Sequence, residues 1–228
     1  MALLALFDID GTLFLTHDPL SSKALLGSLR ELFPVDPADD AVERVDHAGQ
    51  TAKRIARLVL CGEGLDGSAI EPTLDEWCTR FGTAYVELLE HADTHRWEAA
   101  PGASDALERL ERARLRLALL TGNPEPMARA RLVRLGLERF FPVGQGAFGC
   151  DGEERGALIE LARRRAGNWP AERTVEVGDT QRDVETARAA GARAIAVRSR
   201  RAGGTFPEAD AVCDDLAQVS DQLLAWSG

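Results

Sequence analysis

The sequence is poor in lysine and has no long apolar run. Only two of its 27 basic residues are lysines, Lys23 and Lys53, and the others are arginines. Any role that needs a cation outside residues 23–53 therefore falls to arginine. No stretch approaches the roughly 18 apolar residues that a membrane helix needs, and the apolar run before Asp8 is too short for a signal peptide. We therefore expect no membrane partner.

The four cysteines are far apart and form no recognisable motif. There is no CxxC pair and no Cys/His spacing typical of a metal site among Cys61, Cys78, Cys150 and Cys213. This usage predicts reduced, mostly buried thiols in a cytoplasmic protein. The net charge of −10 argues against a nucleic-acid partner, which would need a basic face. It leaves room for a small anionic substrate, because a few local cations can set the potential of one cleft.

Composition and patterning predict an α/β fold. With 228 residues, of which 45% are hydrophobic and 28% charged, the chain suits one large domain or a core domain with a smaller insert. Short apolar runs without polar alternation predict parallel strands covered by helices on both faces. The expected strands are Leu3–Phe7, Leu115–Leu120, Phe141–Val143, Thr174–Val177, Ala194–Val197 and Ala211–Cys213. The expected helices between them are Ala103–Arg112, Pro126–Leu135, Arg155–Arg165, Arg182–Ala190 and Leu216–Trp226.

Residues 16–96 follow a different pattern. They contain no convincing strand, and apolar residues such as Ile55, Leu58 and Val59 recur at helical spacing. We therefore predict a core formed by residues 1–15 and 97–228, and a separate small helical bundle formed by residues 16–96.

The clearest chemical signal is Phe7-Asp8-Ile9-Asp10-Gly11-Thr12-Leu13 at the end of the first expected strand. An Asp-x-Asp pair there projects two carboxylates from the carboxyl edge of the sheet, where α/β proteins bind ligands. Gly11 lets the backbone turn away sharply. Neighbouring carboxylates are electrostatically costly unless a cation or a functional pKa split compensates them. The alternative is an ordinary Asp-Gly turn with solvated side chains.

A second signal follows the next core strand. Thr121, Gly122 and Asn123 combine a hydroxyl, a small residue with an N–H group and an amide just before a helix, which suits an oxyanion cradle. Since such residues also cap helices routinely, this signal is weak by itself.

A third signal is Gly178-Asp179-Thr180-Gln181-Arg182-Asp183, after another apolar strand. A favourable helix dipole could account for one aspartate here. A second one, beside Asp8 and Asp10, calls for a cation. Four carboxylates at one sheet edge are hard oxygen ligands that suit Mg²⁺.

The order and spacing of these segments resemble the haloacid dehalogenase superfamily, in particular its phosphatases. The matching motifs are DxDGT, a Ser/Thr at a strand end, and GDxxxD, and the resemblance spans most of residues 1–200. It implies a Rossmann-like, doubly wound parallel sheet. The helical insert resembles the cap of the phosphoglycolate phosphatase-like branch.

The resemblance also implies roles for individual residues. Asp8 matches the nucleophile that forms an aspartyl-phosphate, and Asp10 matches the acid/base that protonates the leaving group and then activates water. Mg²⁺ would be held by Asp8, the backbone carbonyl of Asp10, and Asp179, with Asp183 as a further ligand or an orienting group. Thr121 matches the hydroxyl that binds phosphate, and Gly122 and Asn123 accompany it.

One position departs from the family pattern. The lysine that usually precedes the helix before the last motif is missing, and Arg155 occupies the corresponding place. We therefore expect Arg155 to bind the phosphate through two hydrogen bonds. Arg129 and Arg182 remain possible substitutes, because they follow the second and fourth strand ends.

Several other functions compete with a phosphatase that hydrolyses a small phosphorylated metabolite. A phosphomutase would use the same motifs. A dehalogenase of this family usually lacks the second aspartate of the first motif. A phospho-accepting receiver domain would be near 120 residues without a long insert, and an inactive binding protein would be expected to lose an aspartate. Substrate contacts are expected from the insert, near His47, Gln50, Thr51, Lys53 and Arg54, with His17 at the cleft entrance.

Overall fold

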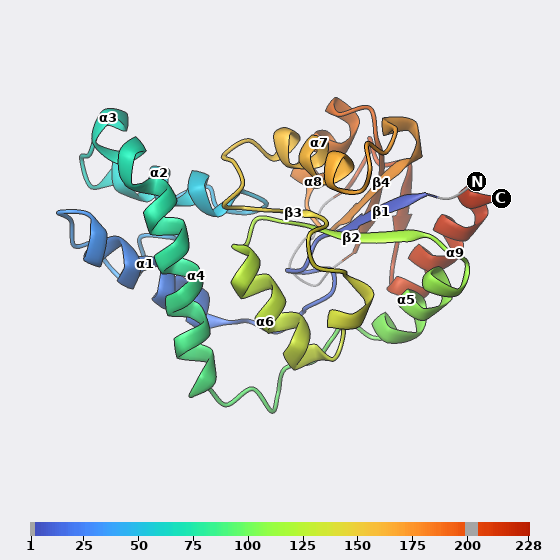
Figure 1. Ribbon diagram of the computed structural model, residues 1–228, viewed down its shortest axis with the longest axis horizontal. Helices are drawn as coiled ribbons and strands as arrows, with labels where there is room; N and C mark the ends of the chain where they lie inside the picture. The colour runs from blue at the N-terminus through green and yellow to red at the C-terminus, as the bar shows by residue number, and fades with distance from the viewer. Residues whose placement is uncertain (1–2, 199–204) are drawn as a thin grey trace.

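A parallel sheet forms the centre of the molecule (Figure 1). The computed structural model describes residues 3–198 and 205–228. All strand pairs are parallel, and the spatial order is β3-β2-β1-β4-β5-β6. The strands are β1 (Leu4–Phe7), β2 (Arg116–Thr121), β3 (Ala147–Phe148), β4 (Thr174–Gly178), β5 (Arg193–Val197) and β6 (Ala211–Cys213).

Helices cover both faces of this sheet. They are α5 (Ala103–Arg112), α6 (Glu125–Leu135), α7 (Arg155–Arg165), α8 (Gln181–Ala189) and α9 (Leu216–Ser227). Apolar residues of α5, α6 and α9 share one buried cluster with Ala5 and Phe7 of β1, whereas those of α7 and α8 pack with Leu4 and Leu6. Successive strand side chains point to opposite faces, so both faces of β1 are buried. The predicted doubly wound α/β fold is confirmed.

Four α-helices and one 3-10 turn (Glu71–Thr73) lie between β1 and α5 in the chain, and no strand is found there in residues 17–96. The α-helices are α1 (Pro19–Leu32), α2 (Ala52–Gly62), α3 (Gly67–Ile70) and α4 (Leu74–Glu90). Their buried apolar side chains form a third cluster around Trp77, Tyr85 and Leu60, which Met127 of α6 joins from the core. We call residues 16–96 the insert. Figure 1 shows it to one side of the sheet. The division of the chain at residues 15/16 and 96/97 stays a prediction.

The expected strand Phe141–Val143 is wrong. Phe140 ends a 3-10 turn (Glu138–Phe140), Phe141 packs edge-on against Phe7, and Val143 is 83% exposed. The strand at this edge is the two-residue β3, which follows Gly144 and Gly146. Phe140 and Phe141 produce an apolar run in the sequence because they fill the core from a loop, not because they form a strand. β3 has only two residues, which are too few to show a strand pattern.

The prediction that all the cysteines are reduced is also wrong. A disulfide joins Cys78 of α4 to Cys150, which follows β3, while Cys61 is exposed and unpaired and Cys213 is buried and unpaired. The two bonded residues lie 72 positions apart and meet only because the insert packs against the core. Disulfides are rare in reducing compartments. The cysteines therefore no longer support the prediction of a cytoplasmic location.

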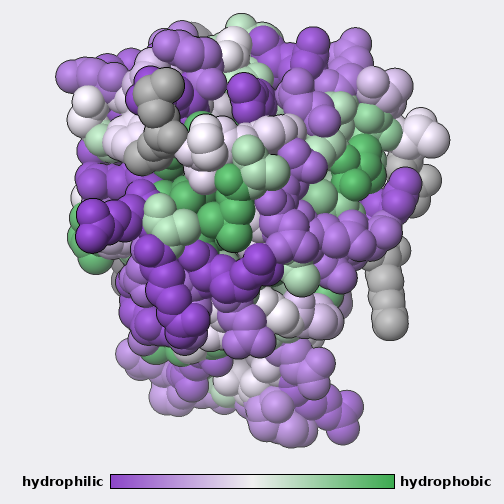
Figure 2. Space-filling model, turned by 90° about the vertical axis from the view of Figure 1, so that its right-hand side faces the viewer, coloured by the Kyte–Doolittle hydropathy of each residue, from purple (hydrophilic) through white to green (hydrophobic). Residues whose placement is uncertain are grey.

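The surface around the chain termini is mainly hydrophilic, with hydrophobic side chains gathered in small separate patches (Figure 2). Among the described residues, no helix combines the length and the apolar character that crossing a membrane would require.

Candidate active site

The strand order brings three sequence motifs to one edge of the sheet. β1 lies between β2 and β4, so Asp8, Thr121 and Asp179 all stand at the carboxyl ends of adjacent parallel strands. Gly11 then turns the chain at a φ of +82°, and a Cβ there would lie 1.9 Å from Asp179 Oδ2. Only glycine permits both this conformation and this close approach.

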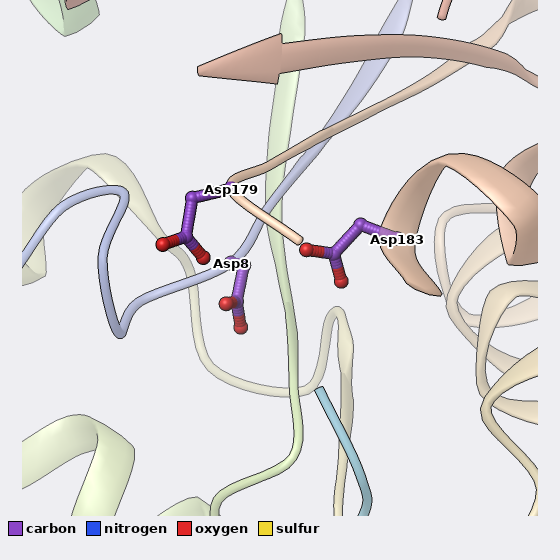
Figure 3. Close-up of side chains that lie close together, drawn as sticks. All are labelled: Asp8, Asp179 and Asp183. Atoms are coloured by element: carbon purple, nitrogen blue, oxygen red, sulfur yellow. The ribbon is translucent and has the colours of Figure 1, made fainter. Parts of the chain in front are cut away.

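Three carboxylates converge at this edge (Figure 3). One oxygen each from Asp8, Asp179 and Asp183 lies within 4.8 Å of the others, and all three residues are buried. A capping box at the start of α8 holds Asp183: its backbone N–H donates to Thr180 Oγ1, and its carboxylate accepts from the Thr180 N–H at 2.9 Å.

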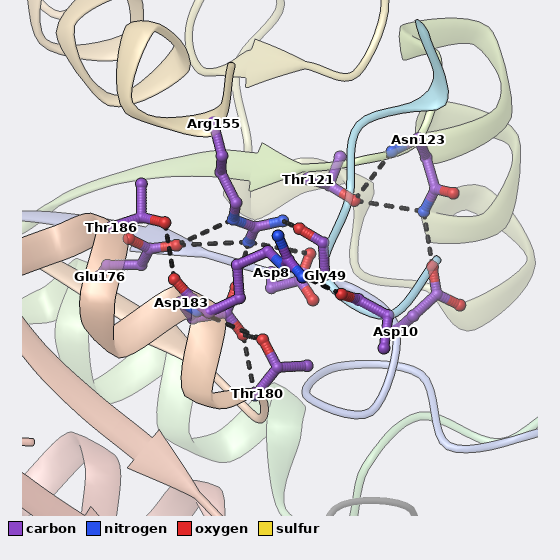
Figure 4. A network of polar contacts seen from close by, with 12 residues as sticks. Asp8, Asp10, Gly49, Thr121, Asn123, Arg155, Glu176, Thr180, Asp183 and Thr186 are labelled. Carbon is purple, nitrogen blue, oxygen red and sulfur yellow. Dashed lines mark hydrogen bonds and ion pairs between the residues drawn. The ribbon is translucent and has the colours of Figure 1, made fainter. Parts of the chain in front are cut away.

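Arg155 is the cation at the centre of this cluster (Figure 4). It begins α7 and is only 6% exposed. Its Nη2 lies 2.5 Å from Asp183 Oδ1, 3.2 Å from Glu176 Oε1 and 3.8 Å from Asp8 Oδ1. The arginine therefore reaches the predicted nucleophile, in the place where the sequence predicts a phosphate-binding cation.

The cluster places four carboxyl groups, from Asp8, Asp179, Asp183 and Glu176, around one arginine. Burial raises the pKa of Asp8 well above its usual range; Arg155 opposes this rise, and Asp183, Asp10 and Asp179 add to it. Burial likewise raises the pKa of Glu176, against the effect of Arg155. A further cation would relieve this repulsion. Three buried carboxylates at such short range fit a small hard divalent ion.

Asp10 does not join this cluster through its side chain. Both carboxylate oxygens accept from Arg131 Nη1 at 2.9 Å, and Asn123 Nδ2 donates to Oδ2 at 2.6 Å. The structure thus brings three of the four expected carboxylates together. Thr121 Oγ1 accepts from the Asn123 backbone N–H and lies 3.2 Å from Asn123 Nδ2 (Figure 4). Asn123 therefore orients Thr121 and Asp10.

The other two candidate arginines lie elsewhere. Arg129 bonds to Glu125 and to the carbonyl of Phe141. Arg182 forms an ion pair with Asp46 of the insert at 2.8 Å. Neither makes a contact with the carboxylate cluster that parallels those of Arg155.

The insert closes over the sheet edge. The Ala52 N–H donates to the Gly122 carbonyl at 2.8 Å, and the Lys53 N–H donates to the Gly149 carbonyl at 3.2 Å. Thr51 Oγ1 donates to the carbonyl of Glu153 at 2.9 Å. The start of α2 is therefore hydrogen-bonded to the loops after β2 and β3.

A cavity of about 660 Å³ lies between insert and core. Asp8, Asp10, Thr121 and Asp179 line it from the core. Of the contacts expected from the insert, His17, His47 and Gln50 line this cavity. Lys53 instead pairs with Asp75 at the outer surface, and Thr51 is used in the contact with Glu153.

Sequence reasoning missed a group of buried polar residues, Arg131, Asp18, Tyr85 and Glu176. Asp18 before Pro19 is a helix-capping signal, and it does cap α1. Glu176 is a charged residue in the middle of the apolar strand β4, and this exception could have identified it from the sequence. Arg131 has no local signal, because it is one of several arginines on α6.

Comparisons with known proteins show the family and the fold of the chain. The family model of haloacid dehalogenase-like hydrolases matches residues 3–191. Phosphoglycolate phosphatase 1 of Pseudomonas aeruginosa is 31% identical over 197 residues, which cover 85% of this chain and 68% of that protein. Phosphoglycolate phosphatase of Chromobacterium violaceum is 28% identical over 95% of this chain and 94% of its own. Among solved structures, CbbY from Rhodobacter sphaeroides has the same fold, with a TM-score of 0.69, 22% identity and 96% of both chains covered. The resemblance seen in the sequence motifs is confirmed.

Proposed function

Because the chain belongs to the haloacid dehalogenase-like hydrolases, we propose that it is a phosphatase that hydrolyses a small phosphate monoester through a covalent intermediate on Asp8. The observation that carries this proposal is the placement of Asp8, at the end of β1, against Asp179, Asp183 and Arg155 on the wall of the cavity between insert and core.

The reaction would proceed in two displacements. Asp8 attacks phosphorus, the bond to the leaving oxygen breaks, and Asp10 gives its proton to that oxygen. Water then attacks the phosphorus of the aspartyl-phosphate and Asp10 accepts its proton, so that inorganic phosphate leaves and the carboxylate of Asp8 is restored. The Asp10 carboxylate lines the same cavity as Asp8, which supports the pairing.

Mg²⁺ is the proposed cofactor. Asp8, Asp179 and Asp183, with the backbone carbonyl of Asp10, are the residues that would hold it. Such an ion supplies charge neutralisation for the phosphoryl oxygens and favours the ionised form of the nucleophile.

Binding of the phosphate group is assigned to Arg155, the Thr121 hydroxyl and the backbone N–H of Gly122. Arg155 lies 3.8 Å from Asp8, close enough to contact oxygens of a phosphoryl group on that carboxylate. Asn123 supports this group, because it donates to both Thr121 and Asp10.

The substrate is proposed to be a small phosphorylated metabolite. Phosphoglycolate is the first candidate, because relatives at 31% and 28% identity carry that name. His17, His47 and Gln50 contribute polar groups to the insert side of the cavity and would contact the organic part.

The test is release of inorganic phosphate from a panel of phosphoglycolate, glycerol phosphates, sugar phosphates and 4-nitrophenyl phosphate. We expect activity with Mg²⁺, its loss after EDTA, its return with Mg²⁺, and none above background for Asp8→Asn. Undiminished turnover by folded Asp8→Asn would contradict the covalent mechanism. Transfer of the phosphoryl group to a sugar phosphate, with no release of phosphate, would identify a mutase instead.

A further inference from the structure

Arg131 of α6 is a buried cation that contacts the core and the insert at once. It is 1% exposed, and its Nη1 donates to both oxygens of Asp10 at 2.9 Å. On its other edge, Nη2 donates to Asp18 Oδ2 at 2.7 Å, and Nε donates to the Tyr85 hydroxyl at 3.0 Å. One guanidinium thus joins a carboxylate of the active site to two residues of the insert.

Aromatic rings fix the plane of this guanidinium. Its central carbon lies 5.3 Å from the centre of the Phe14 ring and 5.3 Å from that of Tyr85. Both distances suit a cation–π contact. A lysine ammonium could not satisfy these partners together, because its donors do not form a planar fork.

Asp18 and Tyr85, the two residues of the insert that contact Arg131, also form hydrogen bonds within the insert. Asp18 caps α1, where its Oδ1 accepts from the Leu20 N–H at 2.9 Å. Its Oδ2 also accepts from the Tyr85 hydroxyl at 2.6 Å. The contact with Arg131 therefore depends on where α1 and α4 sit relative to the core.

The Asp10 carboxylate is held from both sides but remains accessible. Arg131 binds one side and Asn123 donates to Oδ2 at 2.6 Å. The Asp10 side chain is still 39% exposed and lines the cavity. Its orientation relative to a substrate is thus set by these two donors.

We propose that Arg131 is a positioning residue that orients the Asp10 carboxylate toward the leaving group, and that it does so only while Asp18 and Tyr85 hold the insert closed on the core. This inference rests on the proposed function, in which Asp10 is the proton donor. It links closure of the insert to the placement of the acid through one side chain.

The test compares two leaving groups. The value of kcat/KM covers the steps up to departure of the leaving group, and an alkoxide needs a proton far more than 4-nitrophenolate does. We expect Arg131→Lys to lower kcat/KM by about 10- to 100-fold for the best alkyl phosphate of the panel, but by less than about threefold for 4-nitrophenyl phosphate. Tyr85→Phe should show the same selectivity with a smaller loss, because it removes only one hydroxyl.

The matched control is Arg134→Lys. Arg134 lies on the same helix and donates to the Leu89 carbonyl of α4, whereas the side-chain donors to Asp10 within the described residues are Arg131 and Asn123. We expect no selective change there. Equal losses on both substrates, or no loss, in Arg131→Lys would overturn the inference. If that variant does not fold, Tyr85→Phe decides by the same criterion.

Failure of the two proposals can be told apart. Absence of phosphate release by the wild-type protein would contradict the proposed function itself. Release by the wild type, together with non-selective effects in folded variants of Arg131 and Tyr85, would contradict only the positioning role.

Discussion

At the scale of single residues, Arg155 compensates buried carboxylates, and we propose that it also binds the phosphate. It faces Asp8, Asp183 and Glu176, so its charge offsets part of their repulsion. Removal of one partner of a buried ion pair strongly destabilises the fold, because the remaining charges are left without compensation. An anionic phosphoryl group beside Asp8 would meet the same guanidinium.

For Arg155→Ala we therefore expect two effects. kcat/KM should fall by roughly 10²–10³, as for loss of one preorganised donor. The free energy of unfolding should fall by roughly 3–5 kcal/mol. Steady-state kinetics and chemical denaturation measure these changes, and Arg155→Lys should recover part of both.

The control for Arg155 is Arg165→Ala, on the same helix. Arg165 pairs with Asp151 at 2.7 Å, away from the carboxylate cluster. It should leave kcat/KM nearly unchanged. A loss smaller than about tenfold in Arg155→Ala would move the phosphate-binding role to another residue.

At the scale of elements, the start of α2 and the end of β2 approach too closely for a side chain between them. A Cβ on Gly122 would lie 2.1 Å from the Gln50 carbonyl oxygen, and one on Gly149 would lie 1.7 Å from the Gly122 carbonyl oxygen. Because these neighbours are backbone atoms, they cannot rotate away. The glycines are therefore what lets the insert close on the sheet edge.

We expect Gly122→Ala to push the segment before α2 away from β2. Overpacking of this kind typically costs about 1–3 kcal/mol of stability, and kcat/KM should fall because part of the cavity wall is displaced. Thermal unfolding and phosphate release check both effects. Gly27→Ala in α1, where a Cβ meets nothing within 4 Å, is the control and should be neutral or stabilising. Equal behaviour of the two variants would contradict the steric argument.

At the scale of the whole molecule, the disulfide between Cys78 and Cys150 fastens the insert to the core. It joins two residues that lie 72 positions apart, and cross-links of this kind stabilise mainly by restricting the unfolded chain. We expect Cys78→Ser, or treatment with a thiol reductant, to lower the free energy of unfolding by about 2–4 kcal/mol. Denaturant unfolding measures this.

Cys61→Ser is the matched control, because Cys61 is exposed and unpaired. It should behave as the wild type with and without reductant. A wild-type protein whose stability does not respond to reductant would show that the bond does not contribute in solution.

The sequence by itself determined five of the six strands described in the sheet, and the three carboxylates of the cluster. Asp8, Asp179 and Asp183 could be found because each follows a buried strand within a few residues, and parallel strands end at one edge. These are local relations, in which turn chemistry and strand periodicity fix where a side chain goes. β3 could not be predicted from the sequence, because two residues are too few to show the periodicity of a strand.

Only the tertiary structure decided which distant residues meet. Arg131 lies 121 positions from Asp10, and Tyr85 lies 67 from Asp18, and no spacing rule relates either pair. The same holds for Cys78 and Cys150. The packing of the insert on the core determines which of these residues meet. A buried cation in that contact is stable only where carboxylates or other acceptors compensate its charge. Local sequence therefore places the groups of the site on their strands, and packing decides what surrounds them.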